Sequence, residues 1–230
     1  MSEAAKSTRI PIVERVLEAN DQLAEGVRAE LERRGIFAVD IIGAPGSGKT
    51  ALLEATLRAL TGRRRPAAGR APAVLVGDLA TRRDGDRLAK WCDQVVQIST
   101  GQGCHLEAGQ VRDALAQIDL SKVDLLFIEN VGNMICPVGF DLGQAAKVGV
   151  FAVTDGDDKA AKHPYLVQEA DVILLNKIDL LPHVPFDRSI FDADVRLLNP
   201  SVPILDVSST TGEGLDAWLE WLDRGGAAKS

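Results

Sequence analysis

The chain has 230 residues, of which 46% are apolar and 26% charged, and its formal net charge is -7. This length and composition predict one soluble globular domain, and the acidic balance excludes a general nucleic-acid binder, because such proteins need clustered positive charge to displace counterions from phosphates. No stretch has the apolar length of a signal-peptide core or a membrane span, so we expect a cytoplasmic protein with no membrane partner.

The first predicted element is an amphipathic helix. From Ile12 to Leu31 apolar residues recur at helical spacing, with charged residues between them. We expect residues 1–35 to form an N-terminal segment whose helix packs on the core, residues 36–224 to form the main domain, and residues 225–230 to be a disordered tail.

A phosphate-binding loop follows the first predicted strand. The apolar run 37–42 leads into Gly43-Ala44-Pro45-Gly46-Ser47-Gly48-Lys49-Thr50, which matches G-x-x-x-x-G-K-[ST] at every fixed position, and residues 50–60 are strong helix formers. In such a loop backbone N–H groups surround the α- and β-phosphates, the lysine reaches the β- and γ-phosphates, and the threonine hydroxyl binds magnesium. The alternative is a glycine-rich turn without a ligand.

Alternating strands and helices are predicted for the rest of the chain. The stretch 61–73 is rich in arginine, glycine, alanine and proline, which indicates a solvated loop; an arginine finger is the alternative. Beyond it, six apolar runs are separated by helix-compatible stretches, at 73–76, 94–98, 123–128, 148–153, 172–175 and 203–207. This pattern predicts an α/β fold with a doubly wound, mostly parallel sheet of about seven strands, whose ligand lies at the carboxyl ends of the strands.

Carboxylates stand at the ends of two of these strands. Asp78 ends the second predicted strand and Glu129 the fourth, so with Thr50 they are candidate magnesium ligands. Asp84 lies just beyond Asp78, on an expected mobile loop. The candidate catalytic residues are therefore Lys49, Asp78 and Asp84, and solvated carboxylates at helix starts are the alternative for the acidic ones.

Two of the three cysteines also follow predicted strands. Cys104 and His105 are adjacent beyond the run 94–98, and Cys136 lies beyond the run 123–128. Loops that leave one edge of a sheet can bring two thiolates and an imidazole together, a set that suits a soft or borderline metal such as nickel or zinc. Water or a second protomer would complete the coordination. Two half-buried thiols and a surface histidine are the alternative, and we expect Cys92 to be a core residue.

A guanine-recognition motif follows the run 172–175. Asn176-Lys177-Ile178-Asp179 reads N-K-x-D, and it resembles the GTPase motif whose aspartate accepts hydrogen bonds from two N–H groups of guanine. Adenine presents the opposite pattern, so GTP is favoured over ATP. A serine-rich loop follows the last strand and resembles the loop that backs the guanine. The residues expected to bind the nucleotide are Gly43, Ala44, Pro45, Gly46, Ser47, Gly48, Lys49, Thr50, Ala51, Asn176, Lys177, Asp179, Ser208, Ser209 and Thr210.

Five motifs in order resemble the hydrogenase maturation GTPases of the HypB family, which belong to the SIMIBI class of P-loop proteins. They are GQGCHLE, LLFIENVGNMICP, FDLG with VTDGDDK, LLNKIDLLP and TTGEGLDAW, between about residues 36 and 222. The resemblance implies a slow GTPase with Mg²⁺ as cofactor that binds nickel or zinc through Cys104, His105 and Cys136 at a GTP-promoted homodimer interface. It also implies that the protein works with other maturation proteins to deliver nickel to the large subunit of [NiFe]-hydrogenase.

Three rival interpretations remain at the level of the sequence. The urease maturation GTPase UreG has a similar architecture but typically carries Cys-Pro-His, whereas Cys136-Pro137 is followed here by Val138. A GTP-gated scaffold without enzymatic activity is the second rival. An ATP-dependent kinase is the third, and Asp179 argues against it. The sequence has neither the N-terminal cysteine motif nor the histidine-rich tract of many HypB relatives, so nickel storage is not implied.

Overall fold

The computed structural model describes residues 12–62, 71–78, 83–101 and 103–226. The central part of the predicted loop at 61–73, with its arginine-finger alternative, lies outside the described residues, as do residues 79–82 and the end of the predicted tail. Within the described part, every predicted strand is present.

One sheet of seven parallel strands organises the molecule, in the order β3-β2-β4-β1-β5-β6-β7. The strands are β1 (Phe37–Gly43), β2 (Ala71–Asp78), β3 (Val95–Ser99), β4 (Val123–Glu129), β5 (Ala146–Ala152), β6 (Val172–Asn176) and β7 (Ile204–Val207). The doubly wound α/β fold predicted from the sequence is confirmed.

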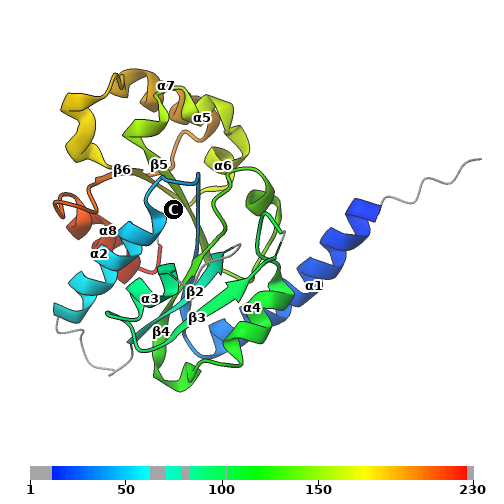
Figure 1. Cartoon of the computed structure of the whole chain (residues 1–230). Coiled ribbons are helices and arrows are strands. Elements are labelled where there is room, and N and C mark those ends of the chain that lie inside the picture. Colours follow the sequence, from blue (N-terminus) through cyan, green and yellow to red (C-terminus); the bar gives the residue numbers. More distant parts are fainter. Residues whose placement is uncertain (1–11, 63–70, 79–82, 102, 227–230) are drawn as a thin grey trace, which may run out of the picture.

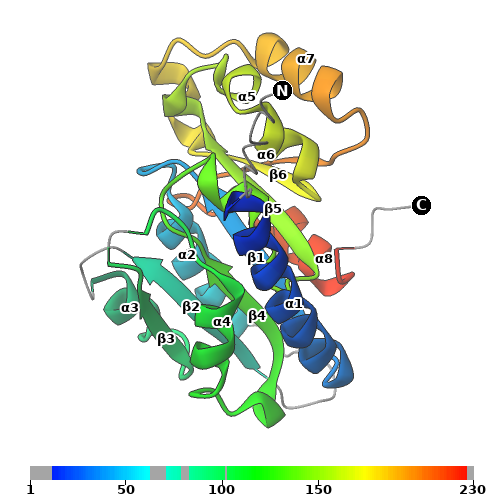
Figure 2. The same cartoon turned by 90° about the vertical axis from the view of Figure 1, so that its right-hand side faces the viewer.

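Helices cover both faces of this sheet (Figures 1 and 2). They are α1 (Ile12–Arg33), α2 (Lys49–Gly62), α3 (Arg83–Leu88), α4 (Ala108–Leu115), α5 (Lys159–Lys162), α6 (Pro164–Glu169), α7 (Arg188–Leu198) and α8 (Leu215–Asp223), with short 3-10 helices η1 (Leu120–Lys122), η2 (Cys136–Gly139), η3 (Val153–Asp155) and η4 (Ile178–His183). Helices α2, α3 and α8 lie on one face, and α1 and α4 lie on the other; α5, α6 and α7 gather beside β5 and β6.

Alternation along the strands sorts the core into layers. In β1, Val39 and Ile41 contact the cluster that contains α2 and α8, whereas Ala38 contacts the cluster that contains α1 and α4. Successive side chains of a strand point to opposite faces, and helices bury both faces here. A strand that is buried on both faces needs apolar residues at successive positions. This is why the strands were visible in the sequence as continuous apolar runs.

The N-terminal helix α1 packs against α4 through its apolar face, with Val27 and Leu31 buried. Gly35 follows the helix with φ 66°, and Ile36 N–H donates to Leu31 O at 2.9 Å, which closes the last turn. The amphipathic helix predicted from the sequence is present. The division of the chain after residue 35 stays a prediction.

The chain changes direction across the sheet beside β1. The connection after β1 leads through α2 to β2, whereas the connection after β4 leads to β5 on the other side of β1. In doubly wound sheets such a switch point opens a crevice at the carboxyl ends of the strands. Gly43 and Glu129 end β1 and β4 at this point.

Candidate nucleotide and metal sites

The predicted phosphate-binding loop joins the end of β1 to the start of α2. Gly46 and Gly48 have φ values of 78° and 93°, a backbone conformation that residues with a Cβ rarely adopt. At Gly48 an added Cβ would also lie 2.5 Å from Asn176 Nδ2. Glycine is required at this position for both conformation and space.

Lys49 is folded back onto this loop. Its Nζ donates to the backbone oxygens of Gly43 at 3.1 Å and Ala44 at 3.2 Å. Burial lowers the pKa of the ammonium group, against the opposing effect of the Glu129 carboxyl. A phosphate oxygen that replaced the two carbonyls would find the lysine already in place.

Thr50 and Glu129 meet beside the loop. Thr50 Oγ1 donates to Glu129 Oε1 at 2.6 Å, and the buried Oε2 has no hydrogen-bond partner among the described residues. Burial raises the pKa of Glu129 to about 7, and the bond from Thr50 opposes that effect. A carboxylate oxygen without a partner beside a threonine hydroxyl fits a hard cation such as Mg²⁺, which prefers oxygen ligands.

A cavity of about 370 Å³ lies between the phosphate-binding loop and the ends of β2 and β4. Asp78, the last residue of β2, lines it together with Asp84. The sequence placed Asp84 on a mobile loop, and that prediction is wrong: Asp84 lies in the first turn of helix α3, which has acidic residues at its start and buries Leu88.

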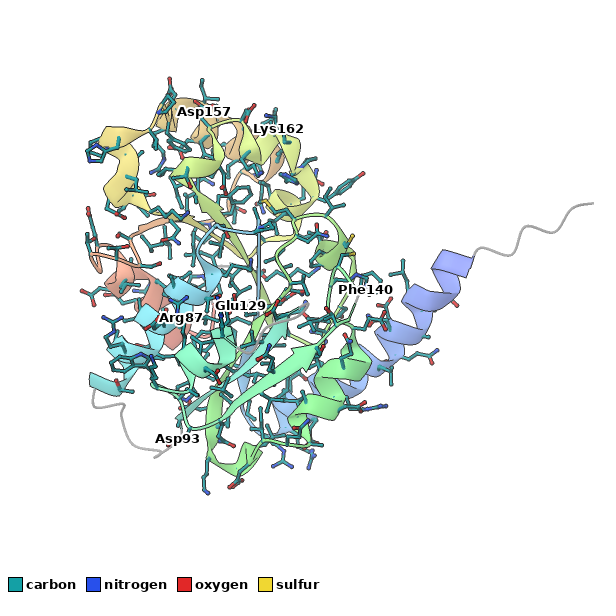
Figure 3. The ribbon with its side chains drawn as sticks, viewed as in Figure 1. Arg87, Asp93, Glu129, Phe140, Asp157 and Lys162 are labelled. Carbon is teal, nitrogen blue, oxygen red and sulfur yellow. The ribbon has the colours of Figure 1, made fainter. Side chains whose placement is uncertain are left out.

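Arg87 also lines this cavity, and sequence analysis missed it. Its Nη2 donates to Glu54 Oε2 at 2.7 Å, and its Nη1 lies 3.8 Å from Asp84 Oδ1. In Figure 3 Arg87 and Glu129 are labelled close to each other beside α2. Residues three apart lie on the same face of a helix. The spacing of Arg87 from Asp84 was therefore the signal in the sequence that could have placed Arg87 beside the cavity.

The predicted guanine motif lies against the phosphate-binding loop. Asn176 ends β6, and its Nδ2 donates to Ser47 O at 2.9 Å. Lys177 has a left-handed φ of 63°, and its Nζ donates to Gly46 O at 2.6 Å. These bonds hold the predicted guanine motif directly against the predicted phosphate-binding loop.

The serine-rich loop after β7 lies against the same motif. Ser208 Oγ donates to Asp179 Oδ1 at 2.6 Å, and Ser209 Oγ donates to Asn176 Oδ1 at 3.0 Å. The N–H of Thr210 in turn donates to Ser208 Oγ at 3.3 Å. The structure thus brings together the two loops that the sequence assigned to the guanine base.

Cys104, His105 and Cys136 form a cluster at the surface. One potential ligand atom from each lies within 4.8 Å of the other two, and Cys104 Sγ lies 3.5 Å from His105 Nδ1. Ligand atoms 2.0–2.3 Å from a tetrahedral ion lie roughly 3.3–3.8 Å apart, so small movements would suffice. A hydrogen bond with Cys136 raises the pKa of the Cys104 thiol, and an incoming ion would have to displace that proton.

The surroundings of His105 orient its ring. Phe140 packs on it with ring centroids 3.8 Å apart and the ring planes tilted by 32°, and Nε2 is buried 3.9 Å from Glu107 Oε1 with no hydrogen-bond partner among the described residues. Burial lowers the pKa of His105, which favours the neutral form that binds metals. The sequence analysis gave Phe140 and Glu107 no role; the signals for them were their places in the FDLG and GQGCHLE motifs and the closeness of Glu107 to His105 in the chain.

The third cysteine is separate from this cluster. Cys92 is buried, as predicted, and its thiol donates to Pro72 O at 3.1 Å. Among the described residues, no helix combines the length and the apolar character that a bilayer crossing needs.

Comparison of the sequence with known proteins identifies a family of nucleotide-binding domains. The family described as "CobW/HypB/UreG, nucleotide-binding domain" matches residues 37–206, a range that begins in β1 and ends in β7. The hydrogenase maturation factor HypB of Azotobacter vinelandii is 44% identical over 220 residues, which are 96% of this chain and 71% of that protein.

Solved structures agree in fold. HypB from Archaeoglobus fulgidus superposes with a TM-score of 0.81 at 38% identity, over 90% of this chain and 98% of that one. HypB from Helicobacter pylori in complex with nickel superposes with a TM-score of 0.83 at 32% identity, over 92% and 99%. The chain therefore belongs to the HypB family of hydrogenase maturation factors.

Proposed function

We propose that this protein is a GTP-hydrolysing metallochaperone that carries nickel or zinc and assists nickel insertion into [NiFe]-hydrogenase. The observation that carries the proposal is the cluster of Cys104, His105 and Cys136 on the same chain as a complete phosphate-binding loop and guanine motif. A HypB relative forms a complex with nickel, which supports nickel as the cargo.

Guanine selectivity is assigned to Asp179. Its carboxylate accepts from Ser208 Oγ and keeps further acceptor capacity for the N–H groups of a base. Adenine would leave those oxygens facing an acceptor, and unpaired buried groups of this kind discriminate strongly between ligands. The proposed nucleotide is therefore GTP, with GDP as product.

Magnesium is assigned to Thr50, Glu129 and Asp78. The buried Glu129 oxygen without a partner supports the assignment, and the ion would neutralise phosphate charge. Lys49 and the loop N–H groups would hold the phosphates, while Asp78 and Asp84 would position water. Catalysis of this kind depends on positioning and charge, and slow intrinsic turnover is expected.

The metal cargo is assigned to Cys104, His105 and Cys136. Two thiolates and an imidazole suit both nickel and zinc. Glu107, close to the second ring nitrogen of His105, stands where an outer carboxylate commonly fixes the orientation of a histidine ligand. The proposed cycle includes a GTP-promoted homodimer and contacts with other maturation proteins and with the hydrogenase large subunit.

Calorimetry tests this function. We expect wild type and Cys92→Ala to bind nickel or zinc equally well, and Cys104→Ala to bind at least about tenfold more weakly, because one of the three ligands is lost. The wild type should bind GTP in preference to ATP. Equal metal binding by wild type and Cys104→Ala would instead favour the GTP-gated scaffold.

A further inference from the structure

We propose that Asn130 is a positioning residue that couples the nucleotide site to the metal site within one protomer. The inference rests on the proposed function and adds a physical connection between its two sites. Glu129 and Asn130 are consecutive at the carboxyl end of β4, and their side chains reach different sites. In Figure 3, Glu129 lies toward α2 and Phe140, which covers His105, lies toward α1.

The alternation of β4 produces this division. Phe127 belongs to the core on the side of α2, and Ile128 belongs to the core on the side of α1 and α4. Asn130 N–H continues the ladder by donating to Ile41 O at 3.1 Å, so the alternation extends beyond the strand. Glu129 therefore points to the phosphate-binding loop and Asn130 points to the opposite face.

The buried amide group of Asn130 is hydrogen-bonded through both its oxygen and its nitrogen. Its side-chain oxygen accepts from the N–H groups of Leu106 at 3.1 Å and Val131 at 3.0 Å. Its Nδ2 lies 3.1 and 3.3 Å from the two carboxyl oxygens of Asp40, which is itself fully buried on β1. Leu106 directly follows His105, so this amide fixes the backbone of the loop that carries two of the three metal ligands.

The segment that follows Asn130 touches both sites again before it reaches Cys136. Gly132 packs so closely on Pro45 of the phosphate-binding loop that an added Cβ would lie 3.1 Å from its Cα. Asn133 forms a β-bridge with Gly43, and its Nδ2 donates to Cys104 O at 3.4 Å. Residues 129–136 therefore run along the phosphate-binding loop and end at a metal ligand.

Nucleotide binding must disturb the start of this segment. Phosphates compete with the carbonyls that now hold Lys49, and one of these belongs to Gly43, the bridge partner of Asn133. A magnesium ion competes for the Thr50 hydroxyl that now donates to Glu129. Because Glu129 and Asn130 are buried, and Asn130 and Asn133 are hydrogen-bonded to the Cys104 loop, a shift at either contact is passed to that loop. Coupling of this kind is reciprocal, so metal should change nucleotide affinity by the same factor.

The test compares nickel dissociation constants measured with GDP and with a non-hydrolysable GTP analogue, both with magnesium. For wild type we expect the two constants to differ about fivefold or more. In Asn130→Ala the ratio should fall to within about twofold of one, although both ligands still bind. The matched control is Asn199→Ala, which removes a half-buried amide bonded to Val167 O and Ala170 O far from both sites and should keep the wild-type ratio.

Exchange of the buried pair is the rescue. Asn130→Asp alone places two carboxyl groups against each other and should bring the ratio of the two nickel dissociation constants close to one. Adding Asp40→Asn exchanges the two side chains, so that the amide at position 40 donates to the carboxylate at position 130. That carboxylate still accepts from Leu106 N–H. The ratio of the double variant should return to within about twofold of the wild-type ratio. A role of Asn130 in stability alone does not predict that this ratio returns.

The outcomes separate the inference from the proposed function. If wild type binds nickel and GTP but the ratio is one, or if folded Asn130→Ala keeps the wild-type ratio, the coupling fails and the proposed function stands. If wild type binds neither ligand, both fail. Should Asn130→Ala not fold, Asn133→Ala decides, because it removes the bond to Cys104 O together with the acceptor of Ile135 N–H next to Cys136: a lowered ratio supports the coupling and an unchanged ratio overturns it.

Discussion

The hydrogen-bonding pattern of Asp179 can be changed by a single substitution of nearly the same size. Its carboxylate only accepts hydrogen bonds, as guanine requires, whereas an amide both donates and accepts. We expect Asp179→Asn to lower GTP affinity roughly 100-fold, the loss expected for one or two charged hydrogen bonds. It should also improve binding of xanthosine triphosphate, whose second carbonyl can accept from the amide. Titration with both nucleotides measures this exchange.

The control for this exchange is Asp187→Asn, because Asp187 caps α7 through Ser189 N–H and should leave both affinities unchanged. Equal weakening of both nucleotides in Asp179→Asn would mean that the loop had been damaged and would contradict the assignment of Asp179 to the base.

Two buried carboxyls make stability depend on pH. Burial raises the pKa of Asp40 from 3.8 and that of Glu129 from 4.5, in both cases to about 7. A raised pKa means that the folded state holds these protons more tightly than the unfolded state, so the stabilisation is complete below about pH 4 and is lost as the pH rises to about 7. At about 1.36 kcal/mol per pKa unit, Asp40 contributes on the order of 4 kcal/mol to this loss and Glu129 on the order of 3 kcal/mol.

Chemical denaturation at several pH values measures this dependence. We expect the nucleotide-free protein to lose stability between about pH 4 and 7, and Glu129→Gln to lose about half as much, because only Asp40 then titrates in this range. The same dependence in Glu129→Gln as in wild type would show that the pKa of Glu129 is not raised in the folded state.

At the scale of elements, helix α1 holds the two segments that carry the metal ligands. Asn20 is buried on α1; its Nδ2 donates to Asp141 O at 2.8 Å, and its Oδ1 accepts from Ala108 N–H at 2.9 Å. Ala108 begins α4 just after His105, and Asp141 directly follows Phe140. One side chain on α1 thereby fixes the distance between the two sides of the cluster.

Asn20→Ala tests this arrangement. The variant should unfold about 1–3 kcal/mol more easily, because two buried backbone groups lose their partner. It should also bind nickel about tenfold more weakly, as expected when outer contacts of a metal site are lost. Denaturation and calorimetry measure the two effects, with Asn199→Ala as the matched amide control. A loss of stability without a loss of nickel affinity would confine Asn20 to a packing role.

At the scale of the whole molecule, the exposed position of the metal cluster bears on assembly. Cys104 is exposed and Cys136 half-buried, so a second protomer has access to both. Three ligands leave a tetrahedral ion one short, and symmetric contact across a two-fold axis can supply more. This accessibility supports the proposed homodimer.

Sedimentation measures the assembly directly. We expect a doubling of mass with a non-hydrolysable GTP analogue and magnesium, and a monomer with GDP. Lys49→Ala should stay monomeric in both, because the phosphates lose their lysine contact. An identical mass with both nucleotides would remove the homodimer from the cycle and leave the assignments of the two sites intact.

The sequence by itself determined the features that depend on local order along the chain. Gly43–Thr50 could be read as a phosphate-binding loop because its chemistry lies within eight consecutive residues, and Asn176–Asp179 is equally local. The seven strands were visible because parallel strands covered on both faces must be continuously apolar. The same locality misplaced Asp84, since a six-residue helix has too few turns to show a period.

Only the tertiary structure decided what meets across the sheet. The sequence was compatible with Cys136 lying either beside Cys104 and His105 or apart from them. In the sheet, β2 alone separates β4 from β3, and this strand order brings the three residues together. The contacts of Asn130 with Asp40 and Leu106 had no signal in the sequence at all. Such contacts depend on register and on which strands are neighbours, and periodicity within a strand carries no information about either.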